Sequence, residues 1–180
     1  MSTKLWDQYF LKIAKAVSTN SKCMSRQIGA VLVKDKAIIA TGYNGPPRGI
    51  PHCKERHNSD GLLCKEFAKR DLSPPLPTKT FNLCPRVWLK YNSGEGLFLC
   101  PATHAEANCI AQAARSGIST LDTTMYLTCG VPCKNCLALL INAGVAEIVC
   151  TSLDYYDELS EFILGHSSLI VREYYKEEEI

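Results

Sequence analysis

Residues 103–151 have the sequence THAEANCIAQAARSGISTLDTTMYLTCGVPCKNCLALLINAGVAEIVCT, in which two helix patterns alternate with two strand patterns. An alanine-rich segment, 103–116, ends at Gly117, a typical glycine cap at a helix C-terminus. A second helix is expected over 132–143, because proline favours the first turn of a helix and a glycine follows the segment. Strands are expected over 124–128, which is rich in β-branched and aromatic residues, and over the apolar run 145–151.

The flanking residues continue this alternation, which predicts an α/β fold with a mixed sheet and helices on both of its faces. Residues 45–100 show no periodicity and predict an irregular, cysteine-rich insertion that needs something else to order it. The whole chain, 1–180, is expected to form one domain. The other predicted elements are helices over 4–18 and 155–164, strands over 28–33, 37–43 and 169–174, and a charged, solvated tail at 176–179.

The composition excludes several classes of protein. Hydrophobic residues make up 46% of the 180 residues and charged residues 21%, which suits a globular domain with a real core. The net charge of +2 lacks the basic excess of proteins that grip long nucleic acids, so no polynucleotide partner is expected. No signal peptide or membrane span is recognisable, so we expect no membrane partner and a cytoplasmic location, in a host cytoplasm if the chain is viral. Reducing conditions there favour metal binding over disulfides for the ten cysteines.

Two short motifs at the starts of the two helices gather metal-ligand residue types. They are HAE at 104–106 and PCKNC at 132–136. A step of three residues in a first helical turn lets the sulfurs of Cys133 and Cys136 face one point. With His104 as a third ligand, a tetrahedral zinc ion keeps one open position, as catalytic zinc requires. Helix N-termini favour negative charge, so both thiols are expected to ionise readily.

Glu106 has a different predicted role. It lies two residues from His104 and therefore projects beside the metal, where it can move protons between a water molecule and a substrate. The order H-x-E followed by P-C-x-x-C is the signature of zinc-dependent deaminases. A structural zinc knuckle or a redox pair formed by Cys133 and Cys136 are the alternatives. A redox pair leaves His104 and Glu106 unexplained, and a structural zinc normally takes a fourth protein ligand.

Segments along nearly the whole chain resemble the deoxycytidylate deaminases of the cytidine deaminase superfamily. The most specific is TGYNGPPRG, since the zinc motif alone would fit adenosine deaminases that act on tRNA equally well. The segments are SRQIGAV (25–31), TGYNGPPRG (41–49), HAEAN (104–108), QAARSG (112–117) and PCKNC (132–136).

The resemblance implies a three-layer α/β/α sandwich with a five-stranded mixed sheet. It implies zinc-dependent hydrolysis of dCMP to dUMP and ammonia, which supplies dUMP for dTMP synthesis. It also implies a homo-hexamer, activated by dCTP and inhibited by dTTP, with Mg²⁺ accompanying the triphosphate effector. The effector-binding residues implied in this way are Gly42, Tyr43, Asn44, Gly45, Arg48 and Arg115.

Four residues are candidates for binding the substrate. A monophosphate needs a cation or helix amides, and Arg26 is the candidate, although it could be an ordinary solvated loop arginine. Asn44 follows a strand and can hydrogen-bond the sugar. Asp154 and Tyr155 come just after the strand 145–151, where ligands often approach such sheets, although Tyr155 could simply pack.

Arg115, one of the effector candidates, ends a helix, where a cation also complements the helix dipole.

The remaining cysteines fall into two groups. Several relatives carry a second zinc that ties the insertion to the start of the hairpin, and one zinc could order a segment that buries little apolar surface. The expected ligands are Cys23, Cys53, Cys84 and Cys100, although Cys64 or His52 could replace one of them, and all of these thiols could instead be free. The residues expected only to pack are Cys109, Cys129 and Cys150.

Two other functions compete with dCMP deamination. A polynucleotide or tRNA deaminase would need a basic groove or stacking aromatic residues, which the net charge of +2 argues against. A non-catalytic, zinc-stabilised nucleotide-binding module would not need Glu106, which is present.

Overall fold

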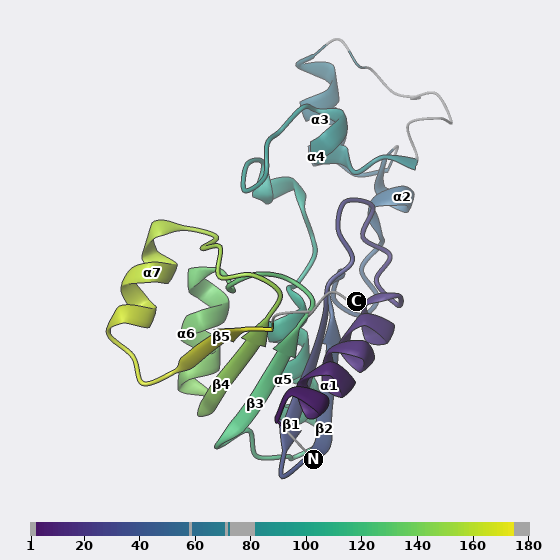
Figure 1. Cartoon of the computed structure of the whole chain (residues 1–180). Coiled ribbons are helices and arrows are strands. Elements are labelled where there is room, and N and C mark those ends of the chain that lie inside the picture. Colours follow the sequence, from purple (N-terminus) through teal and green to yellow (C-terminus); the bar gives the residue numbers. More distant parts are fainter. Residues whose placement is uncertain (1–2, 58, 71, 73–81, 175–180) are drawn as a thin grey trace, which may run out of the picture. The chain divides into compact units, whose positions relative to one another are not determined.

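The computed structural model describes residues 3–57, 59–70, 72 and 82–174, which fall into two compact units (Figure 1). The described residues among 1–21, 28–44 and 104–180 form the first, here called the sheet unit. Those among 22–27 and 45–103 form the second, here called the insertion unit. The charged tail predicted at 176–179 lies outside the described residues, and the prediction of one domain stays a prediction. Among the described residues, no helix is both long and apolar enough to cross a membrane.

A five-stranded mixed sheet forms the centre of the sheet unit, as predicted. Its strand order is β2-β1-β3-β4-β5. Strand β1 pairs antiparallel with both β2 and β3, whereas β3, β4 and β5 run parallel to one another. The β1–β2 hairpin turns through Asp35 and Lys36, which both have positive φ angles, as a tight two-residue turn requires. The strands are β1 (Gly29–Lys34), β2 (Ala37–Tyr43), β3 (Thr123–Leu127), β4 (Val145–Cys150) and β5 (Ile170–Glu173).

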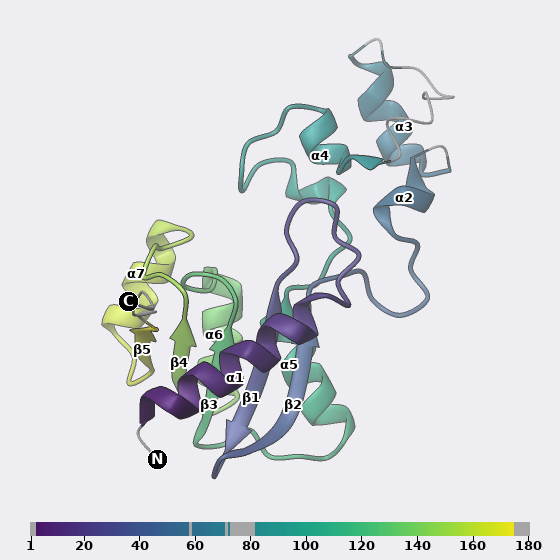
Figure 2. The same ribbon diagram turned by 45° about the vertical axis from the view of Figure 1, so that its right-hand side comes forward.

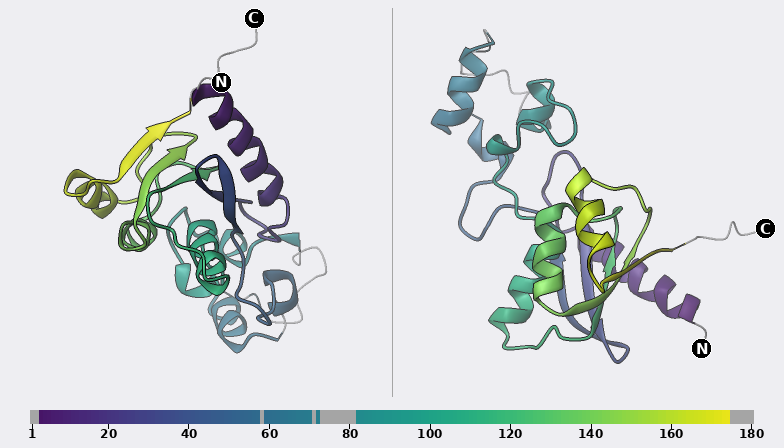
Figure 3. Two further views of the ribbon diagram at one scale, coloured as in Figure 1. Left: turned by 90° about the horizontal axis from the view of Figure 1, so that it is seen from below. Right: turned by 90° about the vertical axis from the view of Figure 1, so that its left-hand side faces the viewer.

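Helices cover both faces of this sheet, so the predicted three layers are confirmed. One face carries α1, and the opposite face carries α5, α6 and α7 (Figures 1 and 3). Each of these helices lies within three residues of its predicted limits. The bounds are α1 (Thr3–Ser18), α5 (Ala105–Arg115), α6 (Lys134–Asn142) and α7 (Glu158–Gly165).

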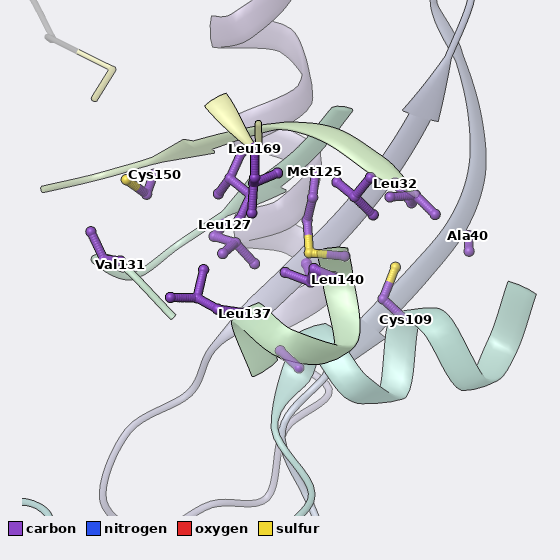
Figure 4. Packing of buried hydrophobic residues seen from close by; sticks show 14 of the residues in the cluster. Leu32, Ala40, Cys109, Met125, Leu127, Val131, Leu137, Leu140, Cys150 and Leu169 are labelled. Atoms are coloured by element: carbon purple, nitrogen blue, oxygen red, sulfur yellow. The ribbon is translucent and has the colours of Figure 1, made fainter. Parts of the chain in front are cut away.

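The strand period of two divides the core between the two faces. Leu32 and Met125 pack with α5 and α6 in the larger cluster, together with the buried Cys109 (Figure 4). Val31 and Tyr126, their neighbours in the chain, pack instead against α1. Side chains of successive strand residues point to opposite faces, so β1, β3 and β4 each supply both clusters. Cys109 and Cys150 are fully buried here, as the sequence predicted.

A partly buried ionic network holds α1 on the sheet. Arg172 of β5 donates hydrogen bonds of 2.6 and 2.8 Å to the two carboxylate oxygens of Asp7, and one of 2.7 Å to Glu147. The Tyr126 hydroxyl donates a further bond of 3.0 Å to Asp7. Figure 2 shows α1 running across the strands that carry these partners. The Asp7 side chain is only 5% exposed, and Arg172 is its ion-pair partner.

Glycine at position 29 allows α1 to approach β1 closely. A Cβ atom at Gly29 would lie 2.0 Å from the carbonyl oxygen of Ala14, which is far inside van der Waals contact. The helix therefore rests directly on the strand backbone at this point.

The insertion unit is more regular than the sequence predicted. Its described residues include four short helical segments and a core formed by Leu63, Phe67, Leu89 and Leu99. Sequence analysis did not predict these segments, because helices of three to eight residues are too short to reveal a period. The segments are α2 (Cys53–Arg56), α3 (Gly61–Ala68), α4 (Pro85–Trp88) and the 3₁₀ turn η2 (Leu97–Leu99).

Candidate active site

The structure brings the three predicted zinc ligands together within the sheet unit. His104 is the N-cap residue of α5, Cys133 is the N-cap residue of α6, and Cys136 lies in the first turn of α6. Their ligand atoms all lie within 4.8 Å of one another. The Nδ1 atom of His104 is 3.5 Å from the Cys133 sulfur and 3.4 Å from the Cys136 sulfur.

These separations fit a zinc ion. Bonds of about 2.3 Å to sulfur and about 2.0 Å to nitrogen at tetrahedral angles place nitrogen and sulfur about 3.5 Å apart. Two sulfurs and one imidazole nitrogen also match the ligands that zinc prefers. The residues present can therefore hold zinc with three protein ligands.

The two thiols interact directly, and their pKa values shift in opposite directions. A hydrogen bond from the Cys136 thiol outweighs burial and, together with His104, lowers the pKa of Cys133 to about 4. The same hydrogen bond raises the pKa of Cys136, as do its burial and the nearby Glu106 carboxylate. The pair is thus an anionic site that a cation would stabilise.

The Glu106 carboxyl group is buried beside this pair. The residue is only 4% exposed, at the second position of α5. Burial raises the pKa of its carboxyl group, although its own N–H and the charge of His104 oppose the shift. A carboxyl group whose pKa moves towards neutrality can both accept and return a proton.

Contacts between α5 and β2 set the position of His104 and Glu106. The Asn108 side chain donates a 2.8 Å hydrogen bond to the carbonyl oxygen of Tyr43, and the Thr41 hydroxyl lies 3.2 Å from Gln112 Oε1. Gly42 lets the helix rest on the strand, since a Cβ atom there would lie 2.2 Å from the Ala105 carbonyl oxygen. Of the predicted effector residues, Gly42 therefore already has a structural role.

Comparison with known proteins identifies the family. The profile of the cytidine and deoxycytidylate deaminase zinc-binding region matches residues 4–152. The chain belongs to this family. The deoxycytidylate deaminase of Mycobacterium phage D29 is 34% identical over 83% of this chain and 96% of its own length.

Two further comparisons cover almost the whole chain. The deoxycytidylate deaminase of Saccharomyces cerevisiae is 31% identical over 97% of this chain. This chain spans about half of that relative, since the match covers 46% of its length. The crystal structure of the dCMP deaminase of cyanophage S-TIM5 has a TM-score of 0.63 at 22% identity, covering 96% of this chain and 98% of that one. This last likeness confirms the predicted cytidine deaminase-like fold.

Three of the residues predicted to bind the substrate lie in the sheet unit. Asn44 is 7% exposed, and its side-chain oxygen accepts a 2.8 Å hydrogen bond from the N–H of Ile28, so it helps to hold the strand end. Asp154 and Tyr155 are exposed in the segment between β4 and α7. The backbone of this segment packs against Gly130, which precedes the cysteine motif. Their contacts with a substrate stay predictions.

The other residues predicted to bind ligands are three arginines, Gly45 and Tyr43. Arg26 and Arg48 are exposed in the insertion unit, as Arg115 is at the end of α5. Exposure leaves these three guanidinium groups accessible to a phosphate, and their roles stay predictions. Gly45 pairs with Thr103 in a short antiparallel bridge, and Tyr43 is exposed at the end of β2.

Four cysteines proposed for a second zinc all belong to the insertion unit. Burial, together with the nearby Cys84, Cys100 and Cys23, raises the pKa of Cys53 to about 11, although Arg56 opposes the shift. The four thiols therefore influence one another electrostatically, although their sulfurs do not meet the spacing of the His104 group. Cys64 lies on α3 within the same unit.

Sequence reasoning missed Asp157 and Ser160, which contact the residues on either side of Cys133. Asp157 caps α7, and an aspartate directly before an amphipathic run is a known helix-start signal. The sequence-based helix limit of 155 concealed this signal.

Proposed function

We propose that this chain hydrolyses the exocyclic amine of dCMP, giving dUMP and ammonia, at the site formed by His104, Cys133, Cys136 and Glu106. The observation that carries the proposal is a buried carboxyl group of raised pKa, Glu106, beside the group of His104, Cys133 and Cys136. The named activities of the phage and yeast relatives support the choice of substrate. The cyanophage structure, in complex with dCMP and dUMP, supports the same choice.

The chemistry divides between the metal and the chain. When zinc is bound, it acts as a Lewis acid and lowers the pKa of water to about 7. Glu106 accepts a proton as water adds to C4 of cytosine, and passes it to the ring nitrogen N3. Glu106 then takes the proton of the new hydroxyl group at C4 and transfers it to the departing amine, which leaves as ammonia. One water molecule is consumed for each dCMP, and the product gains a carbonyl group at C4.

Four residues outside the metal-ligand group are proposed to bind the substrate. Arg26 neutralises the monophosphate, and Asn44 hydrogen-bonds the sugar. Asp154 and Tyr155 border the bound nucleotide from the segment after β4. The product dUMP then supplies dTMP synthesis.

Regulation and assembly belong to the same proposal. A homo-hexamer binds dCTP as activator and dTTP as inhibitor, with Mg²⁺, through the effector residues Gly42, Tyr43, Asn44, Gly45, Arg48 and Arg115. The exposed Arg48 and Arg115 support an anionic effector. A cytoplasmic location, in the host if the chain is viral, fits ten cysteines without a disulfide among the described residues.

A second, structural zinc ion held by Cys23, Cys53, Cys84 and Cys100 is also proposed. The effect of Cys84, Cys100 and Cys23 on the pKa of Cys53 supports this second zinc site. Two zinc ions per chain are expected, falling to one in Cys53→Ser and remaining two in Cys64→Ser. One zinc ion per wild-type chain would contradict the second site.

The experiment that tests the activity measures ammonia release from dCMP, CMP, dCTP and deoxycytidine in parallel, with and without dCTP, or dTTP plus Mg²⁺. Selective release from dCMP is expected, faster with dCTP and slower with dTTP. Release only from a cytosine- or adenosine-bearing oligonucleotide would instead identify a polynucleotide deaminase. Binding of dCTP without ammonia release from any substrate would identify a non-catalytic nucleotide-binding module.

A further inference from the structure

Asp157 joins the N-termini of two helices through one carboxylate group. Its Oδ1 atom accepts a 2.9 Å hydrogen bond from the N–H of Ser160, so Asp157 caps the N-terminus of α7. Its Oδ2 atom accepts a 3.1 Å hydrogen bond from the N–H of Lys134, the first residue of α6. One side chain thus completes the first turns of both helices.

Ser160 holds the same segment of chain from the other side of Cys133. Its hydroxyl donates a 3.2 Å hydrogen bond to the carbonyl oxygen of Pro132, and the residue is fully buried. Asp157 and Ser160 therefore fix the backbone directly before and directly after Cys133. Since Asp157 and Ser160 lie within one turn at the start of α7, both hydrogen bonds move with that helix.

The need for outside anchors follows from the position of Cys133. An N-cap residue normally supplies an oxygen that accepts hydrogen bonds from the first N–H groups of its helix. Cys133 occupies this position in α6, but its sulfur serves as a metal ligand. The carboxylate of Asp157 provides an oxygen acceptor from outside the helix.

We propose that Asp157 and Ser160 act as a clamp that positions the Cys133 sulfur for zinc. They are positioning residues, because neither is a ligand of the metal. The clamp fixes the backbone from which Sγ projects, so its loss lets the ligand leave the point that it shares with His104 and Cys136. The inference rests on the proposed function only in assigning zinc to this site.

The decisive variant is Asp157→Ser. A serine at the N-cap of α7 still accepts a hydrogen bond from Ser160, so the helix and the fold are kept. Its shorter side chain has one oxygen and cannot also reach Lys134. Ser160→Ala removes the other anchor and keeps the backbone of α7. Asp157→Ala removes both bonds of the carboxylate.

The matched control removes a hydrogen bond at the C-terminal end of α6. The hydroxyl of Thr120 donates a 2.6 Å hydrogen bond to the carbonyl oxygen of Ala143, the C-cap residue of α6. Thr120→Val removes this bond and loosens α6 without touching its N-terminus. It separates general destabilisation of α6 from loss of the clamp.

The experiment measures zinc affinity by competition with a chelator, on the full chain. The absorption spectrum of the cobalt-substituted protein, which reports thiolate ligand geometry, is recorded in parallel. Outer partners of metal ligands typically change affinity by about 10- to 100-fold, and we expect losses of this order in Asp157→Ser and Ser160→Ala. Thr120→Val should bind zinc as the wild type does. At saturating zinc, the clamp variants should lower kcat for dCMP with little change in KM.

Wild-type zinc affinity and an unchanged cobalt spectrum in Asp157→Ser would overturn the clamp, as would an equal loss in Thr120→Val. Zinc affinity and the cobalt spectrum need no substrate. A wild-type chain that binds zinc but releases no ammonia would therefore contradict the proposed function. Zinc affinity and the cobalt spectrum would still test the clamp.

Discussion

Replacing Gly42 by alanine tests whether the contact between α5 and β2 sets the geometry of the zinc site. A Cβ atom at this position would lie 2.2 Å from the Ala105 carbonyl oxygen and 2.5 Å from the Cys109 nitrogen. Both are backbone atoms of α5, so no side chain can rotate to relieve the clash. Ala105 lies between His104 and Glu106, so any shift of the helix start moves both functional side chains.

The size of the effect follows from these distances. Non-bonded atoms prefer separations of about 3.5 Å, so α5 must move away from β2 by about 1 Å. Overpacking of this kind costs about 1–3 kcal/mol of stability. A displacement of about 1 Å at a catalytic group can cost about 100-fold in rate. We therefore expect Gly42→Ala to fold, to bind zinc more weakly, and to lose about 100-fold in kcat for dCMP.

Two other glycines supply matched controls. Gly29→Ala creates a comparable clash, 2.0 Å from the Ala14 carbonyl oxygen, but against α1 on the opposite face of the sheet. It should lower the free energy of unfolding and leave zinc affinity unchanged. Gly165→Ala meets no atom within 4 Å and should change neither property. Thermal unfolding, chelator competition and ammonia release on all three variants test the reasoning, which fails if Gly29→Ala loses zinc affinity as much as Gly42→Ala does.

Three further changes have expected outcomes. Glu106→Gln should retain zinc but lose about 10²- to 10⁴-fold in kcat, because it cannot transfer protons, and normal turnover in an ammonia assay would exclude that role. Arg172→Leu should destabilise the fold by about 3–5 kcal/mol in urea denaturation, because Asp7 keeps a buried charge, and Asp7→Asn in the same chain should recover part of this loss. Although burial opposes the shift, a hydrogen bond from Arg56 and two backbone N–H groups lower the pKa of Asp60 from 3.8. Its charge therefore stabilises the fold above pH 3.8, and the advantage of wild type over Asp60→Asn should shrink as pH falls below that value, whereas a constant difference would contradict the assignment.

The sequence predicted the features of this fold that depend on local pattern. The α1 helix followed from apolar residues at helical spacing, and the β1–β2 hairpin followed from two β-rich runs around a short turn. The zinc site followed from residue types at fixed offsets within two helix starts. Each of these signals lies within one element or one turn, where spacing determines which side chains share a face.

The features that escaped prediction depend on contacts between distant segments. Asp157 and Lys134 are 23 residues apart, and nothing in the composition of either segment indicates the hydrogen bond between them. The core of the insertion unit joins Leu63 and Phe67 of α3 to Leu89 and Leu99, across a stretch without periodicity. Such contacts are set by tertiary packing, and no local pattern encodes them.

The placement of the metal ligands explains why the site needs support from elsewhere in the fold. His104 and Cys133 both occupy N-cap positions, where exposed N–H groups and the helix dipole favour an anionic site. In this arrangement the N-cap side chain is a metal ligand and does not accept hydrogen bonds from these N–H groups, as an N-cap side chain usually does. In α5 the carboxylate of Glu106 accepts its own N–H, and in α6 the carboxylate of Asp157 accepts that of Lys134. A helix start can therefore present a metal ligand at its cap only where a second acceptor completes the turn, which couples the geometry of the zinc site to the docking of α7 on α6.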